Sequence, residues 1–88
     1  MAVVWIPALL RDLSGGLAQV TVEAGTVGEA IEALESRYPG VGARLCEDGR
    51  LRASMNVVVD GVVSRQKLRH RLTDGSEVHF LPAISGGC

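Results

Sequence analysis

Only one stretch of this chain, residues 26–38, carries the hydrophobic period of an α-helix. Its apolar residues recur every three or four positions, with glutamates on the opposite side. They are Val27, Ala30, Ile31, Leu34 and Tyr38. Thr26 and Glu29 form a capping box at the helix start, and Pro39-Gly40 ends the helix. Because a single amphipathic helix needs a partner layer for its apolar face, we expect it to lie across a sheet.

Strand patterns flank this helix on both sides. Residues 2–6 are β-branched and aromatic, and residues 17–23 partly alternate after a Ser-Gly-Gly turn, so the two segments predict a hairpin. After the helix, residues 55–59 give the strongest strand pattern, and an Asp-Gly turn leads into a short strand at 62–63. Residues 76–82 alternate cleanly between apolar and polar side chains.

Two connections have no strand pattern. Residues 41–52 are glycine-rich with mixed charge, and we expect an irregular connection with one helical turn at 43–46. Residues 65–71 are basic and non-periodic.

The order strand, strand, helix, strand, short strand, strand predicts an α+β fold, a mixed sheet with one long helix packed across it. This is the β-grasp, or ubiquitin-like, arrangement, expected over residues 1–83 and followed by a flexible tail at 84–88.

The composition excludes several classes of protein. The chain has 88 residues, 47% of them hydrophobic, and a net charge of -1, which fits one modest core and argues against disorder, nucleic-acid wrapping and membrane binding. Cys46 and Cys88 match neither a disulfide scaffold nor a zinc site, so we expect a reducing, cytoplasmic compartment. His70 and His79 lack neighbouring ligands and are expected to be solvated. No motif indicates catalytic residues, a metal or a bound cofactor.

The last residues depart from what folding requires. Gly86 and Gly87 lack Cβ atoms, so an extended main chain there could thread a narrow channel and present its carbonyl to another protein's active site. The segment from Ile84 to the end reaches roughly 16 Å when extended. For a bare Gly-Gly, a frayed end without function is the commoner explanation, and the residues before it shift the balance.

Residues 74–87, Asp-Gly-Ser-Glu-Val-His-Phe-Leu-Pro-Ala-Ile-Ser-Gly-Gly, resemble the carboxy-terminal signature of the ubiquitin-like sulfur carriers of the ThiS and MoaD type. That signature is a D-G turn, a strand, L-P-A or P-P, and then G-G. The similarity spans nearly the whole chain, since residues 6–11, 26–31, 34–40 and 56–59 also fit. Among family members, the chain is most similar to the carrier of actinobacterial cysteine synthesis.

The resemblance implies a protein cosubstrate, not an enzyme. An E1-like enzyme would use ATP to adenylate the carboxylate of Gly87, with Gly86 as the thin neck of the tail. A sulfide donor would then convert the adenylate to a thiocarboxylate. A synthase would accept the sulfur for cysteine, thiamin, molybdopterin or thiolated tRNA.

Cys88 departs from the family pattern, because it leaves Gly87 with an amide in place of a free carboxylate. The resemblance therefore implies that a JAMM-type zinc metallopeptidase removes Cys88. The Gly87-Cys88 bond also has the covalent structure of the adduct formed when the carrier of cysteine synthesis delivers its sulfur. Two alternatives stay open: Cys88 is a free surface thiol that forms an adventitious disulfide dimer, or an addition to the natural chain.

A recognition surface is expected beside the tail. If the helix covers one face of the sheet, then Val58, His79 and Leu81 share the open face, where family carriers dock their activating enzyme, although scattered surface apolar residues would need no explanation. Arg11 adds a cation for partner docking, as do Arg65, Lys67, Arg69 and Arg71. Nucleic acid is not an expected partner, because no aromatic side chains interleave with these cations. The rival functions are a protein modifier joined to lysines and a TGS-like interaction module with an inert tail.

Overall fold

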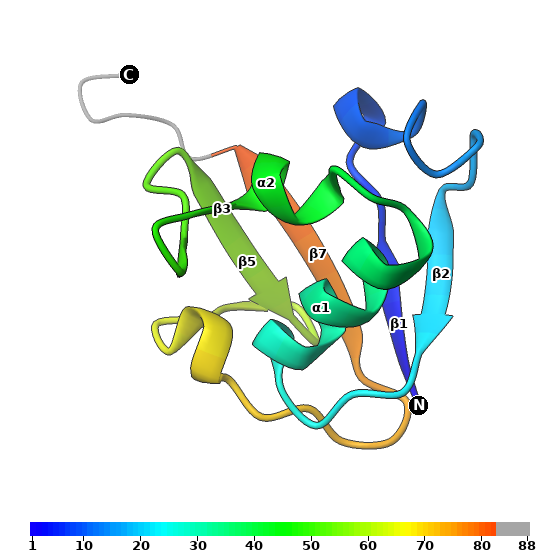
Figure 1. Ribbon diagram of the computed structural model, residues 1–88. Helices are drawn as coiled ribbons and strands as arrows, with labels where there is room; N and C mark the ends of the chain where they lie inside the picture. The colour runs from blue at the N-terminus through cyan, green and yellow to red at the C-terminus, as the bar shows by residue number, and fades with distance from the viewer. Residues whose placement is uncertain (83–88) are drawn as a thin grey trace.

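A five-stranded mixed sheet with one long helix across it forms the body of the molecule (Figure 1). The computed structural model describes residues 1–82. The strand order is β2-β1-β7-β5-β6. The bounds are β1 Ala2–Trp5, β2 Gln19–Val22, α1 Val27–Arg37, β5 Met55–Val59, β6 Val62–Val63 and β7 Glu77–Pro82. This is the predicted β-grasp arrangement.

The pairing of the strands makes β7 the middle strand of the sheet. β1 pairs antiparallel with β2, which confirms the first hairpin, and parallel with β7. On its other side β7 pairs antiparallel with β5, from Met55 opposite Pro82 to Val59 opposite Val78. β7 is therefore paired on both sides over residues 78–79 and with β5 alone from there to Pro82.

The core lies between α1 and the covered face of the sheet. The four predicted apolar positions within the helix are all buried, and Tyr38, where the helix ends, is half-buried. On the sheet, the side chains predicted to face the helix are buried as well: Val57, Val59, Val78 and Phe80. The alternation of β7 is therefore confirmed, with one face of the strand in the core and the other open.

The capping residues hold the two ends of α1. The Glu29 N–H donates to Thr26 Oγ1 at 3.2 Å, as the capping box predicts. The carboxylate of Glu29 accepts from the N–H of Gly25 at 2.8 Å, one residue before the position that the capping box prescribes. At the other end, the Glu35 carboxylate accepts from the N–H groups of Gly40 and Gly42, which ties α1 to the short helix that follows.

The connection over residues 41–52 contains the predicted helical turn, two residues earlier than expected, but the prediction that the rest is irregular was wrong. A helix, α2 (Val41–Leu45), is followed by a hairpin of two short strands, β3 (Cys46–Glu47) and β4 (Arg50–Leu51). Val41 and Leu45 lie one helical turn apart and are both buried, which explains the helix. The hairpin turn is Asp48-Gly49, with φ of 53° and 75°, a left-handed pair for which Asp-Gly is favoured. Two single 3₁₀ turns, Ala8–Leu10 and Lys67–Arg69, complete the elements.

Candidate partner-docking site

A hollow lies where β1 and β7 end. The two strands run parallel, so their carboxyl ends meet at the same edge of the sheet. The hollow has a volume of about 340 Å³ and is lined by Trp5, Ile6, Pro7, Ala8, Arg11, His79, Phe80 and Leu81. Leu81 is followed by Pro82, the last residue of β7. The hollow therefore adjoins the point from which the tail begins.

An aromatic stack forms one wall of the hollow. Trp5 and His79 are register partners on β1 and β7, and their rings stack with centroids 5.2 Å apart and planes 10° apart. The indole Nε1 of Trp5 donates to Glu77 Oε1 at 3.2 Å, which fixes the orientation of the ring. Both rings are half-buried. The result is a flat, oriented aromatic surface on the open face of the sheet.

The structure places three of the four residues that the sequence proposed as a partner interface at this hollow: Arg11, His79 and Leu81. His79 and Leu81 point to the open face, and Leu81 is 49% exposed. Val58 lies directly opposite His79 in the β5–β7 ladder but does not line the hollow. Arg11 reaches the rim, where its Nε donates to the carbonyl of Ile6 at 3.2 Å. The site thus combines apolar and aromatic side chains with one positioned cation, a composition typical of interface centres.

Sequence reasoning missed two members of this surface, Trp5 and Val63. Val63 pairs with Val58 and is 57% exposed, so the row across the sheet runs from Trp5 through His79 and Val58 to Val63. In the structure Trp5 faces the open side because Val4 and Ile6 on either side are buried, but residues 2–6 are all apolar and show no alternation in the sequence. That Trp5 stacks on His79 depends on the parallel pairing of β1 with β7, which no local pattern reveals.

The tail residues Gly86, Gly87 and Cys88 lie outside the described residues. What the structure shows is the strand that leads to them. β7 keeps its ladder to β5 as far as Pro82, opposite Met55. The strand before the tail therefore ends at a fixed point beside the hollow.

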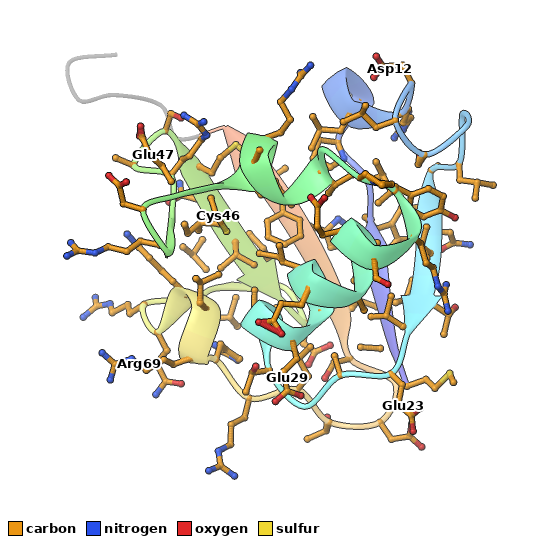
Figure 2. The ribbon with its side chains drawn as sticks, in the orientation of Figure 1. Asp12, Glu23, Glu29, Cys46, Glu47 and Arg69 are labelled. Carbon is orange, nitrogen blue, oxygen red and sulfur yellow. The ribbon has the colours of Figure 1, made fainter. Side chains whose placement is uncertain are left out.

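The described cysteine and the two histidines are held in contacts within the fold. Cys46 is half-buried against the core, and burial raises the pKa of its thiol while Arg52 partly opposes the rise. The prediction of a solvated His70 was wrong, because it is half-buried and its Nδ1 shares a 2.6 Å hydrogen bond with the buried Ser64 hydroxyl. His79 is likewise half-buried in its stack. Figure 2 shows Cys46 toward the interior of the molecule and the neighbouring Glu47 at its outer edge.

Within residues 1–82, no group of three or more His, Cys, Asp or Glu side chains is arranged to hold a metal ion. None of the helices in this part of the chain has the length and apolarity to cross a membrane. The hollow itself holds an imidazole and a guanidinium but no hydroxyl or thiol. Its side chains are suited to binding a partner.

Comparison with known proteins gives a consistent result. The ThiS family model matches residues 4–87. The sulfur carrier protein CysO of Mycobacterium tuberculosis is 35% identical over 87 residues, which cover 93% of this chain and 94% of that protein. Small archaeal modifier protein 3 of Haloferax volcanii is 38% identical over 64 residues, 70% of each chain.

A solved structure agrees with the sequence comparisons. A chain in the crystal structure of the Amycolatopsis orientalis BexX/CysO complex superposes with a TM-score of 0.90 at 36% identity. The superposition covers 99% of this chain and 100% of that one. The sheet, the helix across it and the last strand therefore all have counterparts there. From the family match and this fold, the chain belongs to the ThiS family of β-grasp proteins.

Proposed function

We propose that this chain is a sulfur carrier whose Gly87, once Cys88 has been removed, is adenylated by an E1-like enzyme and converted to a thiocarboxylate. The observation that carries this proposal is the family match over residues 4–87, which includes both tail glycines. The sulfur carrier of Mycobacterium tuberculosis, similar over 93% of the chain, supports it. The chain would be a protein cosubstrate in the cytoplasm, with ATP and sulfide used by its partners.

The chemistry asks little of the carrier. A carboxylate oxygen is a poor leaving group, so the Gly87 carboxylate first attacks the α-phosphate of ATP and releases pyrophosphate. Sulfide then attacks the acyl carbon of the adenylate and displaces AMP, which leaves the thiocarboxylate. Both steps need an unbranched acyl end held in another protein's active site, and glycine supplies it. A synthase then takes the sulfur.

The hollow beside the tail is suited to holding the activating enzyme. Trp5 and His79 offer an oriented aromatic surface, and Leu81 is an exposed apolar anchor. Arg11 is fixed at the rim and offers its outer N–H groups to a carboxylate or carbonyl of the partner. A contact here would fix the start of the tail relative to the partner's active site, which reduces the entropy lost when the tail enters it.

Cys88 must be removed before adenylation, because Gly87 in amide linkage to Cys88 has no carboxylate to attack ATP. We assign its removal to a JAMM-type zinc metallopeptidase, whose metal-bound water attacks the Gly87 carbonyl and releases cysteine. The same hydrolysis would free cysteine from a carrier that had delivered its sulfur to a cysteine precursor. The encoded chain would thus enter the cycle at its hydrolysis step, and cysteine synthesis is the pathway that we favour.

Intact-mass spectrometry tests the carrier function directly. The chain ending at Gly87 is incubated with the cognate adenylating enzyme, ATP and a sulfide source, and we expect its mass to rise by the exchange of one oxygen for one sulfur. The chain that keeps Cys88 is the matched control and should not change. The absence of any ATP-dependent change in the trimmed chain would refute the proposal.

A second mass measurement tests maturation. The full chain is incubated with the cognate peptidase, and the expected product lacks Cys88. A Gly87→Val variant should be cut more slowly, because a branched side chain would obstruct a channel shaped for glycine. Retention of Cys88 by the unaltered chain would overturn the maturation step while leaving the carrier chemistry of the trimmed chain open to its own test.

A protein modifier is the second candidate, favoured by the similarity to small archaeal modifier protein 3. In that case the adenylated Gly87 would be joined to lysines of target proteins. Lysine adducts of the trimmed chain in an ATP-supplied lysate would support the modifier. Sulfur exchange without adducts would support the carrier alone.

A further inference from the structure

A continuous cationic strip follows one side of the molecule. Three adjoining hollows of about 420, 510 and 890 Å³ form it. The first two share Arg50 and Lys67, and the second and third share Arg69. Six of the chain's nine lysines and arginines line the strip: Arg50, Arg52, Arg65, Lys67, Arg69 and Arg71. Its acidic residues, Glu47 and Asp48, lie in the first hollow.

The charges of the chain are segregated along the sequence. Residues 50–71 carry six cations and one carboxylate, a net charge of +5. The remaining residues carry three cations and nine carboxylates, a net charge of -6, and the two parts together give the chain its -1. The near-neutral total therefore conceals a strongly positive region.

Most of this positive charge has no internal partner. Within residues 1–82, the ion pair in the strip joins Arg52 and Glu47 at 3.7 Å. The side chains of Arg65, Lys67 and Arg69 are exposed and make no ion pair or hydrogen bond to the described residues. Because like charges repel one another, an external counter-charge would stabilise this surface.

The strip is formed by a segment with fixed backbone. The carbonyl of His70 accepts from the Val27 N–H at 3.0 Å, and the Leu72 N–H donates to Gly25 at 2.8 Å. Gly28 of α1 packs against the carbonyl of Leu68, which would lie 3.2 Å from an added Cβ. The segment is therefore anchored to the start of α1 within the 3₁₀ turn and directly after it. A partner would meet a preformed surface and lose little to ordering it.

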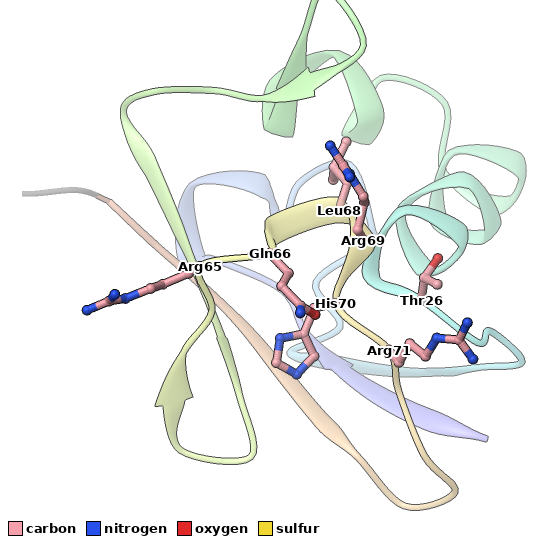
Figure 3. A pocket seen from close by; sticks show the side chains of 7 residues that line it. All are labelled: Thr26, Arg65, Gln66, Leu68, Arg69, His70 and Arg71. Carbon is pink, nitrogen blue, oxygen red and sulfur yellow. The ribbon is translucent and has the colours of Figure 1, made fainter.

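The cations spread apart. In Figure 3 the side chain of Arg65 points to one side of the third hollow, that of Arg71 to the other, and that of Arg69 in a third direction. Such an arrangement fits several anionic groups distributed over a surface, in contrast to a single phosphate. His70 is the one aromatic ring among the residues that line the three hollows, so the strip lacks the stacking platform of single-stranded nucleic-acid sites. An acidic protein surface is the partner that this chemistry favours.

One end of the strip lies next to the end of β7. The Met55 N–H donates to the carbonyl of Arg52 at 2.9 Å, and Met55 lies opposite Pro82, the last residue of β7. Figure 1 shows the β3 hairpin on the same side as the end of β7, with the 3₁₀ turn at the far end of that side. A partner that holds the tail is therefore positioned to cover the strip as well.

We propose that the strip docks against an acidic surface of the adenylating enzyme that takes the tail. The enzyme then holds the carrier at two places, the apolar hollow and the cationic strip. The identity of this partner rests on the proposed function. Opposite charges on the two surfaces would accelerate their encounter and make it sensitive to salt.

Association kinetics with the immobilised enzyme test this proposal, with the full chain and two charge-reversed variants. Arg65→Glu/Arg69→Glu reverses two strip cations. Arg37→Glu/Arg44→Glu reverses two exposed cations on the helices and changes the net charge equally. We expect the strip variant to associate roughly tenfold more slowly at low salt and to lose most of the salt dependence. The control variant should stay close to the unaltered chain.

Equal slowing by both variants, or no binding of the unaltered chain, would overturn the proposal. So would strip-dependent binding of a single-stranded oligo-dT probe combined with unchanged binding of the enzyme, which would make nucleic acid the partner. Thermal unfolding of each variant checks folding, and Arg65→Gln/Arg69→Gln serves if the reversed variant fails to fold. Strip-dependent binding without sulfur exchange on the trimmed chain would refute the carrier function and leave the docking surface standing.

Discussion

At the scale of single residues, β7 divides two tasks between neighbours. Phe80 is 3% exposed and belongs to the core, while His79 and Leu81 on either side face outward at the hollow. His79 in turn stacks on Trp5 of the adjoining strand. One residue step along the strand therefore separates a side chain that holds the fold from one available to a partner.

Substitutions on the two faces of β7 should have different effects, one on partner binding and the other on stability. His79→Ala should weaken binding of the activating enzyme by about fivefold, because it truncates a ring at the proposed contact and such a truncation costs about 1 kcal/mol. It should change the free energy of unfolding by less than about 1 kcal/mol, because the ring is only half-buried. Phe80→Ala, the matched control, should cost about 3–5 kcal/mol of stability through the cavity that it leaves.

Urea denaturation gives the stabilities, and the fluorescence of Trp5, the chain's one tryptophan, reports binding. The opposite pattern, with His79→Ala unfolding the domain and binding unchanged, would show that the stack serves the core.

Cys46 should be an unreactive thiol. Because burial raises its pKa, the thiolate fraction near pH 8 is smaller than that of a free cysteine. We expect iodoacetamide to alkylate Cys46 more slowly in the folded Cys88→Ser variant than in the same variant unfolded in urea. Arg52→Ala should slow the reaction further, since the guanidinium lowers the pKa.

The raised thiol pKa also sets the sign of a pH effect on stability. The folded state favours the neutral thiol, so its contribution is complete below the unfolded pKa, close to 9.0, and is lost as the pH rises through the folded value. Cys46→Ala should remove this alkaline loss. An alkylation rate equal in the folded and unfolded protein would contradict both expectations.

At the scale of elements, long periodic segments were predictable and short ones were not. The helix stripe from Val27 to Leu34 and the alternation of β7 each repeat several times, so both could be read from sequence. The two-residue strands β3 and β4 have no period, and their Asp48-Gly49 turn lay in a stretch dominated by glycine and charge. Of the site, His79 and Leu81 followed from alternation, while the stack on Trp5 required a parallel pairing between distant segments.

The start of α1 offers a test at this scale. Thr26→Ala should lower the free energy of unfolding by about 1 kcal/mol, because the Glu29 N–H loses its acceptor. Thr26→Ser keeps a hydroxyl oxygen in place and should restore most of the loss. Chemical denaturation measures both variants. If serine and alanine destabilise the protein equally, the contribution of Thr26 lies in its packing and not in the cap.

At the scale of the whole molecule, the charge distribution matters more than the net charge. The chain has a sequence pI of about 6.1 and would be expected to pass through a cation exchanger at neutral pH. The strip gathers six cations on one side, however, and Figure 2 shows Arg69 there, away from the carboxylates of Glu23 and Asp12. A molecule can bind an anionic surface through one positive face even when the rest of the molecule is negatively charged.

We therefore expect the chain to be retained on a cation-exchange column at pH 7 and low salt in spite of its pI. Arg65→Glu/Arg69→Glu should abolish the retention, whereas Arg37→Glu/Arg44→Glu, with the same net charge, should be retained more strongly than the strip variant. The salt concentration at elution is the measurement. Equal elution of the two double variants would show that net charge, not its placement, governs the interaction.

The position of β7 has a mechanical consequence. A partner that draws the tail into a channel pulls along the axis of the middle strand, which is bonded to β1 on one side and to β5 on the other. Such a load shears both ladders at once, whereas a pull on an edge strand would peel its bonds apart one after another. The domain should therefore resist unfolding when it is pulled by its C-terminal end, because the load is shared by two ladders of hydrogen bonds.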